Sequence, residues 1–201
     1  MRPSLMLKAW GWPFFLFMKY IVFNKPFGVL SQFTQEVPGQ RTLAEFSFPK
    51  GVYAAGRLDK DSEGLLVLTD DGQFNKNLTR PQFEKNKVYW VQVEGAPSDS
   101  DFKEFRTGLL IKDYKTLPAK VRILKDFEFP PRNPPIRERK NIPTTWIEVT
   151  IHEGKNRQVR KMCAAIGFPC LRLIRAEVGH YKLGDLPIGQ WREVSPKEIL
   201  A

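Results

Sequence analysis

Cysteine and histidine are scarce in this sequence. Its 201 residues include two cysteines, Cys163 and Cys170, and two histidines, His152 and His180. So few residues exclude a disulfide framework, and the sequence has no CxxC or HxxxH spacing that would bind zinc. We therefore expect no metal site. We interpret both cysteines as buried thiols of a reducing compartment, which predicts a cytoplasmic protein.

The sequence also lacks an apolar run long enough to cross a membrane. The nearest candidate is LMLKAWGWPFFLF at residues 5–17, which is too short and is interrupted by a lysine and a proline. It has no convincing cleavage site for a signal peptide either. We interpret residues 1–17 as an extension, disordered or arising from a misplaced start codon, and residues 18–201 as the folded domain. A peripheral membrane anchor at residues 5–17 is the alternative, and we expect no membrane partner.

Acidic residues are too few to balance the basic ones. There are 22 Asp and Glu against 32 Lys and Arg, which gives a formal net charge of +10. Hydrophobic residues make up 42% of the chain, so the composition is that of a folded protein with a core. A positive surplus on a folded domain favours a polyanionic partner, nucleic acid first and an anionic membrane second, over a surface charged only for solubility.

The pattern of apolar residues predicts an α+β fold. Strand patterns follow one another with few helices between them, so we expect a largely antiparallel or mixed central sheet with flanking helices. The expected strands are residues 20–24, 65–69, 89–94, 119–129, 145–151, 171–182 and 191–194. The expected helices are residues 42–46, 73–79, a segment capped by Ser98 or Ser100, and 156–166, which ends at Gly167.

One long segment fits neither a helix nor a central strand. Residues 130–143 contain five prolines, which exclude both. We expect an extended loop or hairpin arm here. Its basic residues are Arg132, Arg137, Arg139 and Lys140.

The segment GRLDKDSEG at residues 56–64 is rich in carboxylates and admits several interpretations. Asp59 or its neighbours could simply cap a turn between strands. A calcium loop is disfavoured because a strand-forming run, LLVLT, follows where oxygen ligands are needed, and because Asp70 stands at the twelfth position in place of Glu. A glycosidase-like carboxylate pair would act on a sugar, whereas the basic charge favours a phosphate-rich substrate. The fourth interpretation comes from a resemblance to a known family.

Four motifs, in order along the chain, resemble those of RNA pseudouridine synthases of the RsuA type. They are KPFG at residues 25–28, GRLDKDSEGLLVLTDDG at 56–72, NKVYWVQVEG at 86–95 and EGKNRQVRKM at 153–162, followed by GFPCLRLIR. The resemblance extends from Met18 onward. TLPA at 116–119 and PRNPPIRERKNIPTTW at 131–146 are most similar to family members that act on large-subunit ribosomal RNA. We expect no S4-type RNA-binding domain, with which the family often begins.

The resemblance implies a fold with two sub-lobes, a cleft between them, and three catalytic residues. Asp59 matches the essential carboxylate, Tyr89 the tyrosine that stacks on the target base, and Arg160 the arginine that pairs with the carboxylate. The helical period agrees, since Arg160 borders an apolar stripe while Arg157 and Lys161 lie further toward solvent. The stripe consists of Val159, Met162, Cys163 and Ile166.

The implied activity is the isomerisation of a uridine in 23S ribosomal RNA to pseudouridine, by base flipping and with no cofactor. Arg57 matches the family residue that holds the flipped nucleotide, and the other basic segments are expected to contact phosphate. The expected RNA-binding residues are therefore Arg57, Lys25, Lys155, Arg157, Lys161, Arg137, Arg139, Lys140 and Arg172. A catalytically silent RNA-binding or ribosome-assembly protein on the same fold is the alternative. We expect a monomer, because no surplus apolar stripe is evident.

Overall fold

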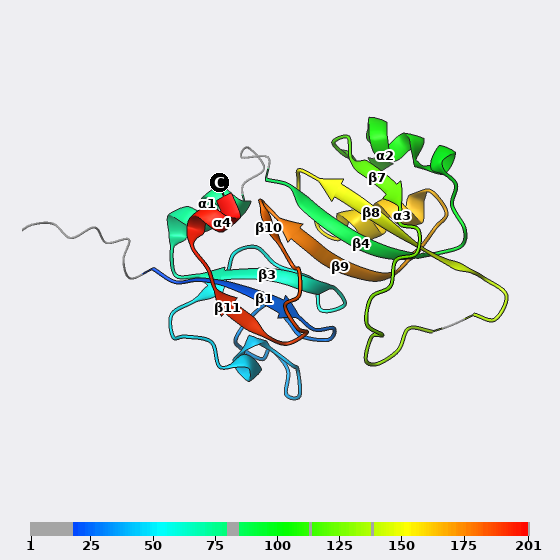
Figure 1. Ribbon diagram of the computed structural model, residues 1–201. Helices are drawn as coiled ribbons and strands as arrows, with labels where there is room; N and C mark the ends of the chain where they lie inside the picture. Colours follow the sequence, from blue (N-terminus) through cyan, green and yellow to red (C-terminus); the bar gives the residue numbers. More distant parts are fainter. Residues whose placement is uncertain (1–17, 80–84, 113, 138, 201) are drawn as a thin grey trace, which may run out of the picture.

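The computed structural model describes residues 18–79, 85–112, 114–137 and 139–200 (Figure 1). The predicted extension at residues 1–17 lies outside this part of the chain. Within the described part, no helix combines the length and the apolar character that crossing a bilayer requires.

One sheet runs through the whole protein and carries its core. Within the described residues it has nine strands in the order β11-β1-β3-β9-β4-β8-β7, with β10 beside β9 and β2 beside β3. Two further strands, β5 (Leu110–Ile111) and β6 (Tyr114–Lys115), form a separate hairpin. The strands of the main sheet are β1 (Tyr20–Lys25), β2 (Tyr53–Ala54), β3 (Glu63–Thr69), β4 (Lys87–Glu94), β7 (Lys120–Ile123), β8 (Thr144–Ile151), β9 (Cys170–Val178), β10 (Tyr181–Lys182) and β11 (Trp191–Glu193).

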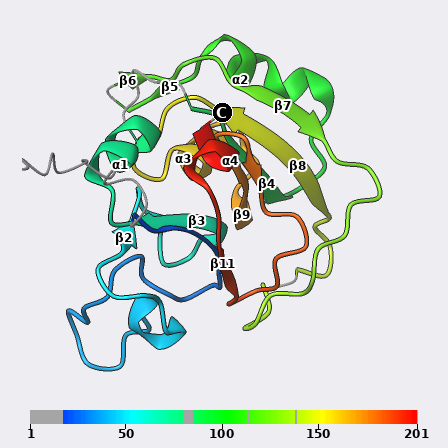
Figure 2. The same cartoon turned by 60° about the vertical axis from the view of Figure 1, so that its left-hand side comes forward.

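Short helices flank the sheet, as predicted. Near the β1–β3 side lie α1 (Gly72–Thr79) and α4 (Pro196–Leu200), and near the β4–β8 side lie α2 (Lys103–Thr107) and α3 (Gln158–Ala165) (Figures 1 and 2). The described residues also contain two 3-10 helices. They are η2 (Leu43–Phe46), which comes before β2, and η4 (Asp99–Phe102), which leads directly into α2. The sequence analysis did not predict α4, β2, β5 or β6, which extend over too few residues to show a period.

The sheet consists of two antiparallel halves joined by one parallel contact. One half contains β11, β1, β3 and β2, and the other contains β9, β10, β4, β8 and β7. They meet where β3 runs parallel to β9, with Glu63 opposite Ile174 and Gly64 opposite Arg175. The predicted α+β class and the predominantly antiparallel sheet are confirmed.

Burial explains which sequence patterns were informative. Every residue of β3 is buried, so its continuous apolar run marks a central strand, whereas in β4 Tyr89, Val91 and Val93 alternate with more exposed neighbours. Val159 and Met162 of α3 pack in the same core cluster as β4, which confirms the predicted stripe. The strand expected over residues 119–129 ends at Ile123 because the chain turns at Asp126, whose φ is +51°.

A buried ion pair holds the two halves together at this junction. Arg172 donates from Nε and Nη2 to the two carboxylate oxygens of Glu63, both at 2.8 Å, and from Nη1 to the carbonyl of Pro130 at 2.7 Å. Its guanidinium also lies over the ring of Phe129, 5.0 Å from the centroid. Arg172 is only 3% exposed, so the prediction that it contacts RNA phosphate is corrected. It anchors the proline-rich arm to the sheet instead.

Gly64 allows β3 and β9 to approach this closely. Its φ is +94°, and a Cβ at this position would lie 2.4 Å from the carbonyl oxygen of Arg175 and 2.8 Å from its amide nitrogen. Both neighbours are backbone atoms, so relief would require the strands to separate. The residue between Glu63 and the apolar run must therefore be glycine.

Gly64→Ala should destabilise the fold by about 3–5 kcal/mol, because it combines a strained φ with a backbone clash. Urea unfolding monitored by tryptophan fluorescence measures this. The matched control is Gly39→Ala, whose φ of +83° imposes similar strain but where a Cβ meets nothing within 4 Å. The control should lose only about 1–2 kcal/mol. Equal losses in the two variants would contradict the close-approach explanation.

Candidate active site

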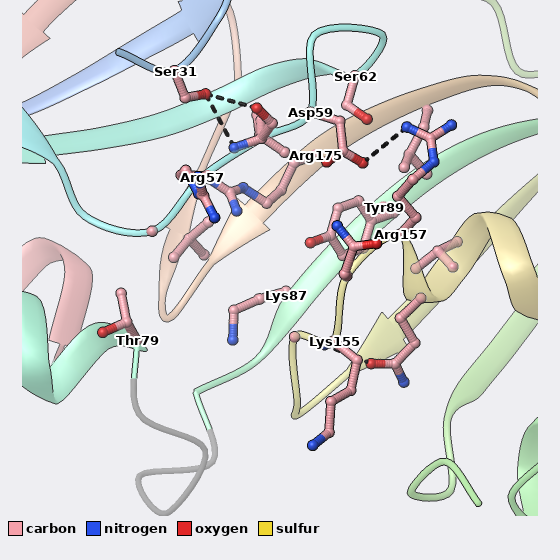
Figure 3. A pocket seen from close by; sticks show the side chains of 18 of the residues that line it. Ser31, Arg57, Asp59, Ser62, Thr79, Lys87, Tyr89, Lys155, Arg157 and Arg175 are labelled. Carbon is pink, nitrogen blue, oxygen red and sulfur yellow. Dashed lines mark hydrogen bonds and ion pairs between the residues drawn. The ribbon is translucent and has the colours of Figure 1, made fainter. Parts of the chain in front are cut away.

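A cavity of about 540 Å³ opens between the two halves of the sheet (Figure 3). Five of the predicted site residues line it: Arg57, Asp59, Tyr89, Lys155 and Arg157. They come from the loop before β3, from β4 and from the loop between β8 and α3. Three further basic residues line it as well: Lys60, Lys87 and Arg175.

Backbone hydrogen bonds fix the loop that carries Asp59. The hydroxyl of Ser31 donates to the carbonyl of Leu58 at 2.8 Å and accepts from the Leu58 amide at 3.1 Å. After Asp59, the amide of Gly28 donates to the carbonyl of Lys60 at 2.8 Å, and the Ser62 amide donates to the carbonyl of Asp59 at 3.0 Å. The carboxylate is therefore presented by a loop that is held on both sides, and its side chain remains 33% exposed.

Lys25 supports this loop region from below and does not reach the surface. It is fully buried, and its ammonium donates to the carbonyls of Val29 at 2.8 Å and Pro26 at 3.0 Å. Burial lowers the pKa of Lys25 to about 7, against the opposing effect of Glu63. The predicted phosphate contact of Lys25 is therefore corrected, because its donors are directed at the backbone of the KPFG turn.

Arg157, rather than Arg160, is the arginine beside Asp59. Its Nη1 lies 3.4 Å from Oδ2 of Asp59, and its two terminal nitrogens donate to the carboxylate of Asp61 at 2.9 and 2.8 Å. Figure 3 shows Arg157 facing Asp59. The predicted pairing of Asp59 with Arg160 is not formed and is corrected.

The helical wheel misplaced Arg157 because this residue is not in the helix. It is the N-cap of α3 with φ +53°, so its side chain turns back toward the acidic loop. Arg160 lies beneath the same loop, where its Nη2 donates to the backbone carbonyl of Asp61 at 2.6 Å and its side chain is 11% exposed. Arg160 supports the loop without lining the cavity.

Tyr89 and Arg175 lie side by side on the neighbouring strands β4 and β9. They are register partners on β4 and β9, next to an irregularity between Val88 and Tyr89, and they are 8% and 4% exposed. Nε of Arg175 donates to the carbonyl of Leu65 at 2.7 Å. Lys87 stands two residues before Tyr89 and lines the same cavity. Strand alternation could have identified it, because residues i and i+2 share a face.

The remaining predicted contacts are spread over the surface. Lys161 lies on α3 and does not line the cavity. On the arm, Arg137, Arg139 and Lys140 are exposed, and Arg139 forms an ion pair with Glu94 at 3.1 Å. Among the residues described, no group of three or more His, Cys, Asp or Glu is arranged to hold a metal ion.

Comparison with known proteins now identifies the family. The family model described as RNA pseudouridylate synthase matches residues 19–165. The chain belongs to this family. Over 176 residues it is 55% identical to ribosomal large subunit pseudouridine synthase E of Vibrio parahaemolyticus, covering 88% of this chain and 74% of that protein. The namesake from Xanthomonas campestris pv. campestris is 53% identical over 174 residues, covering 86% and 93%.

Solved structures agree on the fold. A crystal structure of a pseudouridylate synthase superposes with a TM-score of 0.74 at 29% identity, covering 90% of this chain and 72% of that one. The human RNA pseudouridylate synthase domain containing 1 gives a TM-score of 0.56 at 16% identity, covering 88% and 78%, which shows the fold alone. The expected family, fold and enzyme class are confirmed: the chain is an RNA pseudouridine synthase of the RsuA type.

The geometry predicts which cation controls the acidic loop. Hydrogen bonds from Arg157 lower the pKa of Asp61 below its ordinary value, aided by the charge of Arg160 and opposed by burial. Arg157→Gln should therefore raise the Asp61 pKa toward the ordinary value of about 3.9, measured by carboxyl ¹³C NMR titration. Lys161→Gln is the control, since Lys161 has no described ion pair with Asp61 and lies on α3, the helix that Arg157 caps.

The same shift has a consequence for stability. A carboxyl whose pKa is lower in the folded protein than in the unfolded chain stabilises the fold above the ordinary aspartate range, and this contribution is lost as pH falls through the folded-state pKa. The unfolding free energy of Arg157→Gln should thus fall less steeply on acidification than that of the wild type. An unchanged Asp61 pKa in Arg157→Gln would refute the assignment.

Proposed function

We propose that this enzyme isomerises a uridine of 23S ribosomal RNA to pseudouridine, with Asp59 as the essential carboxylate. The single observation that carries the assignment is the position of Asp59, which is the one acidic residue among those lining the cavity and lies beside the ring of Tyr89 (Figure 3). The names of the relatives at 53–55% identity support large-subunit ribosomal RNA as the substrate.

The chemistry is an isomerisation that needs no external reactant. The N1–C1′ bond of the uridine breaks, the uracil turns, and a C5–C1′ bond forms. C5 loses its proton and N1 gains one, so the atoms balance without a redox cofactor. Asp59 would act as a carboxylate, either as a nucleophile or as a base at the ribose, and Nη1 of Arg157 lies 3.4 Å from its Oδ2.

The cavity also suits a base that has left its stack. Unstacking costs on the order of a few kcal/mol, which contacts inside the pocket must offset. The ring of Tyr89 offers a stacking surface worth roughly 1–3 kcal/mol per base. Arg57 is exposed at the rim of the cavity, where it would hold the flipped nucleotide or fill the space that it leaves.

A catalytically silent RNA-binding protein is less consistent with this arrangement. A carboxylate in a cationic pocket repels the phosphate backbone and so weakens binding. Asp59 stays partly exposed in the cavity while the neighbouring Asp61 takes the two strong hydrogen bonds of Arg157. The carboxylate of Asp59 can therefore reach a substrate in the cavity, which favours an enzyme over a protein that only binds RNA.

Asp59→Asn should abolish tritium release from ribosomal RNA labelled at uridine C5, with a rate at least about 10³-fold lower, because the amide cannot replace an ionised carboxylate. RNA binding, measured by filter retention, should persist. The control is Asp185→Asn, an aspartate whose side chain is 91% exposed and which does not line the cavity. It should release tritium like the wild type. Release by Asp59→Asn at the wild-type rate would disprove the role of Asp59.

The arm provides a separate test of RNA contact. If the exposed Arg137 and Lys140 each meet one phosphate of single-stranded RNA, the double variant to glutamine should reduce the slope of log affinity against log salt by about 1.4. The comparison is the double variant Lys103→Gln and Lys120→Gln, which removes two exposed lysines elsewhere in the same half. An equal reduction in both double variants would indicate non-specific charge and overturn the arm contact.

A further inference from the structure

Two cations of the cavity have no role in the steps described above. Arg175 is 4% exposed, and Lys87 has a half-buried side chain. Both belong to adjacent strands, β9 and β4, and both line the cavity with the ring of Tyr89 (Figure 3). What they bind deepens the proposed function and rests on it.

The guanidinium of Arg175 is incompletely satisfied. Its Nε donates to the carbonyl of Leu65, but Nη2 is buried without any hydrogen-bond partner among the described residues. A buried unpaired donor costs about 1–3 kcal/mol, and more when it is charged. Because Arg175 lines the cavity, its unpaired donor is a candidate partner for a ligand group that the protein itself does not supply.

Lys87 is in a similar state. Among the described residues, the only hydrogen-bond acceptor of its Nζ is the carbonyl of Lys85, at the long distance of 3.4 Å. Its Cε lies close to Gly154, since a Cβ added to that glycine would be 3.9 Å from it. The side chain of Lys87 therefore runs beside the loop between β8 and α3, at the wall of the cavity. Burial, and then the charge of Arg175, lower the pKa of Lys87 to about 8. The two cations on these adjacent strands thus repel each other.

The charge balance indicates what would relieve this repulsion. Asp61 takes the two short hydrogen bonds of Arg157, and among the described residues no ion pair joins Asp59 or Asp61 to Lys87 or Arg175. A uracil base is neutral and would leave both charges uncompensated, whereas a phosphodiester carries one negative charge and accepts several hydrogen bonds. The ring of Tyr89 remains available to the base.

We propose that Lys87 and Arg175 form a phosphate-binding subsite that takes a phosphodiester of the RNA strand next to the flipped uridine. The phosphate would accept from Nη2 of Arg175 and from Nζ of Lys87, which lie on the adjacent strands β9 and β4. Binding at this point would fix the ribose of the flipped nucleotide relative to the carboxylate.

Lys87→Met tests the subsite, because it removes the charge and keeps most of the side-chain volume. Loss of a charged hydrogen bond should lower kcat/KM for tritium release by about 10- to 100-fold. The urea midpoint should stay the same or rise, since a strained cation has been removed. Lys87→Arg should recover part of the activity. Lys120→Met, at an exposed position on β7, should leave both quantities unchanged.

Inorganic phosphate gives a readout that does not need activity. Phosphate should raise the Tm of wild type and Lys120→Met more than that of Lys87→Met. If no protein releases tritium but this difference is present, the subsite stands and the proposed function fails. If Lys87→Met retains wild-type kcat/KM, the subsite is overturned and the function stands. A large fall in the urea midpoint of Lys87→Met, with no difference in phosphate protection, also overturns the subsite and makes Lys87 structural.

Discussion

The buried ion pair between Glu63 and Arg172 is the constraint on which the rest of the structure depends. Two antiparallel half-sheets meet at one short parallel contact, and the pair lies at that contact with both side chains almost completely excluded from solvent. Removing one partner from a buried pair leaves an uncompensated charge, which typically costs about 3–5 kcal/mol. Arg172 also holds the arm through Pro130, so the junction fixes the relative position of both halves and the arm.

The cavity is a consequence of the same junction. Along a strand, residues three apart point to opposite faces, so Arg172 meets Glu63 on one face of β9 while Arg175 reaches the cavity on the other. On β3, Glu63 follows directly after the loop that carries Asp59. The side chains that join the half-sheets are therefore covalently close to those that line the site, and a shift at the junction would move Asp59 relative to Tyr89. Gly64 matters for function for this reason as well as for stability.

The sequence predicted the elements well where a pattern was long, and it predicted several residues that line the cavity, among them Asp59 and Tyr89. The α3 stripe and the alternation in β4 depend only on local period, and both are present. The roles of basic residues were harder, since charge alone does not report burial. Lys25 and Arg172 are residue types that often contact phosphate, yet both are buried. Lys25 donates to backbone carbonyls, and Arg172 donates to the carboxylate of Glu63. Arg157 was misplaced because a left-handed N-cap lies outside the helical period.

The two arginines of β9 show how structure and site can be distinguished when residue type and burial are the same. Arg172 and Arg175 are 3% and 4% exposed, and each donates to a main-chain carbonyl. Arg172 is neutralised by Glu63 and its terminal donors are used. Arg175 has an open terminal nitrogen and a cationic neighbour in place of an acidic one. Folding alone would favour a carboxylate near Arg175. Among the described residues no carboxylate forms an ion pair with Arg175, and the proposed subsite assigns the compensating charge to the RNA.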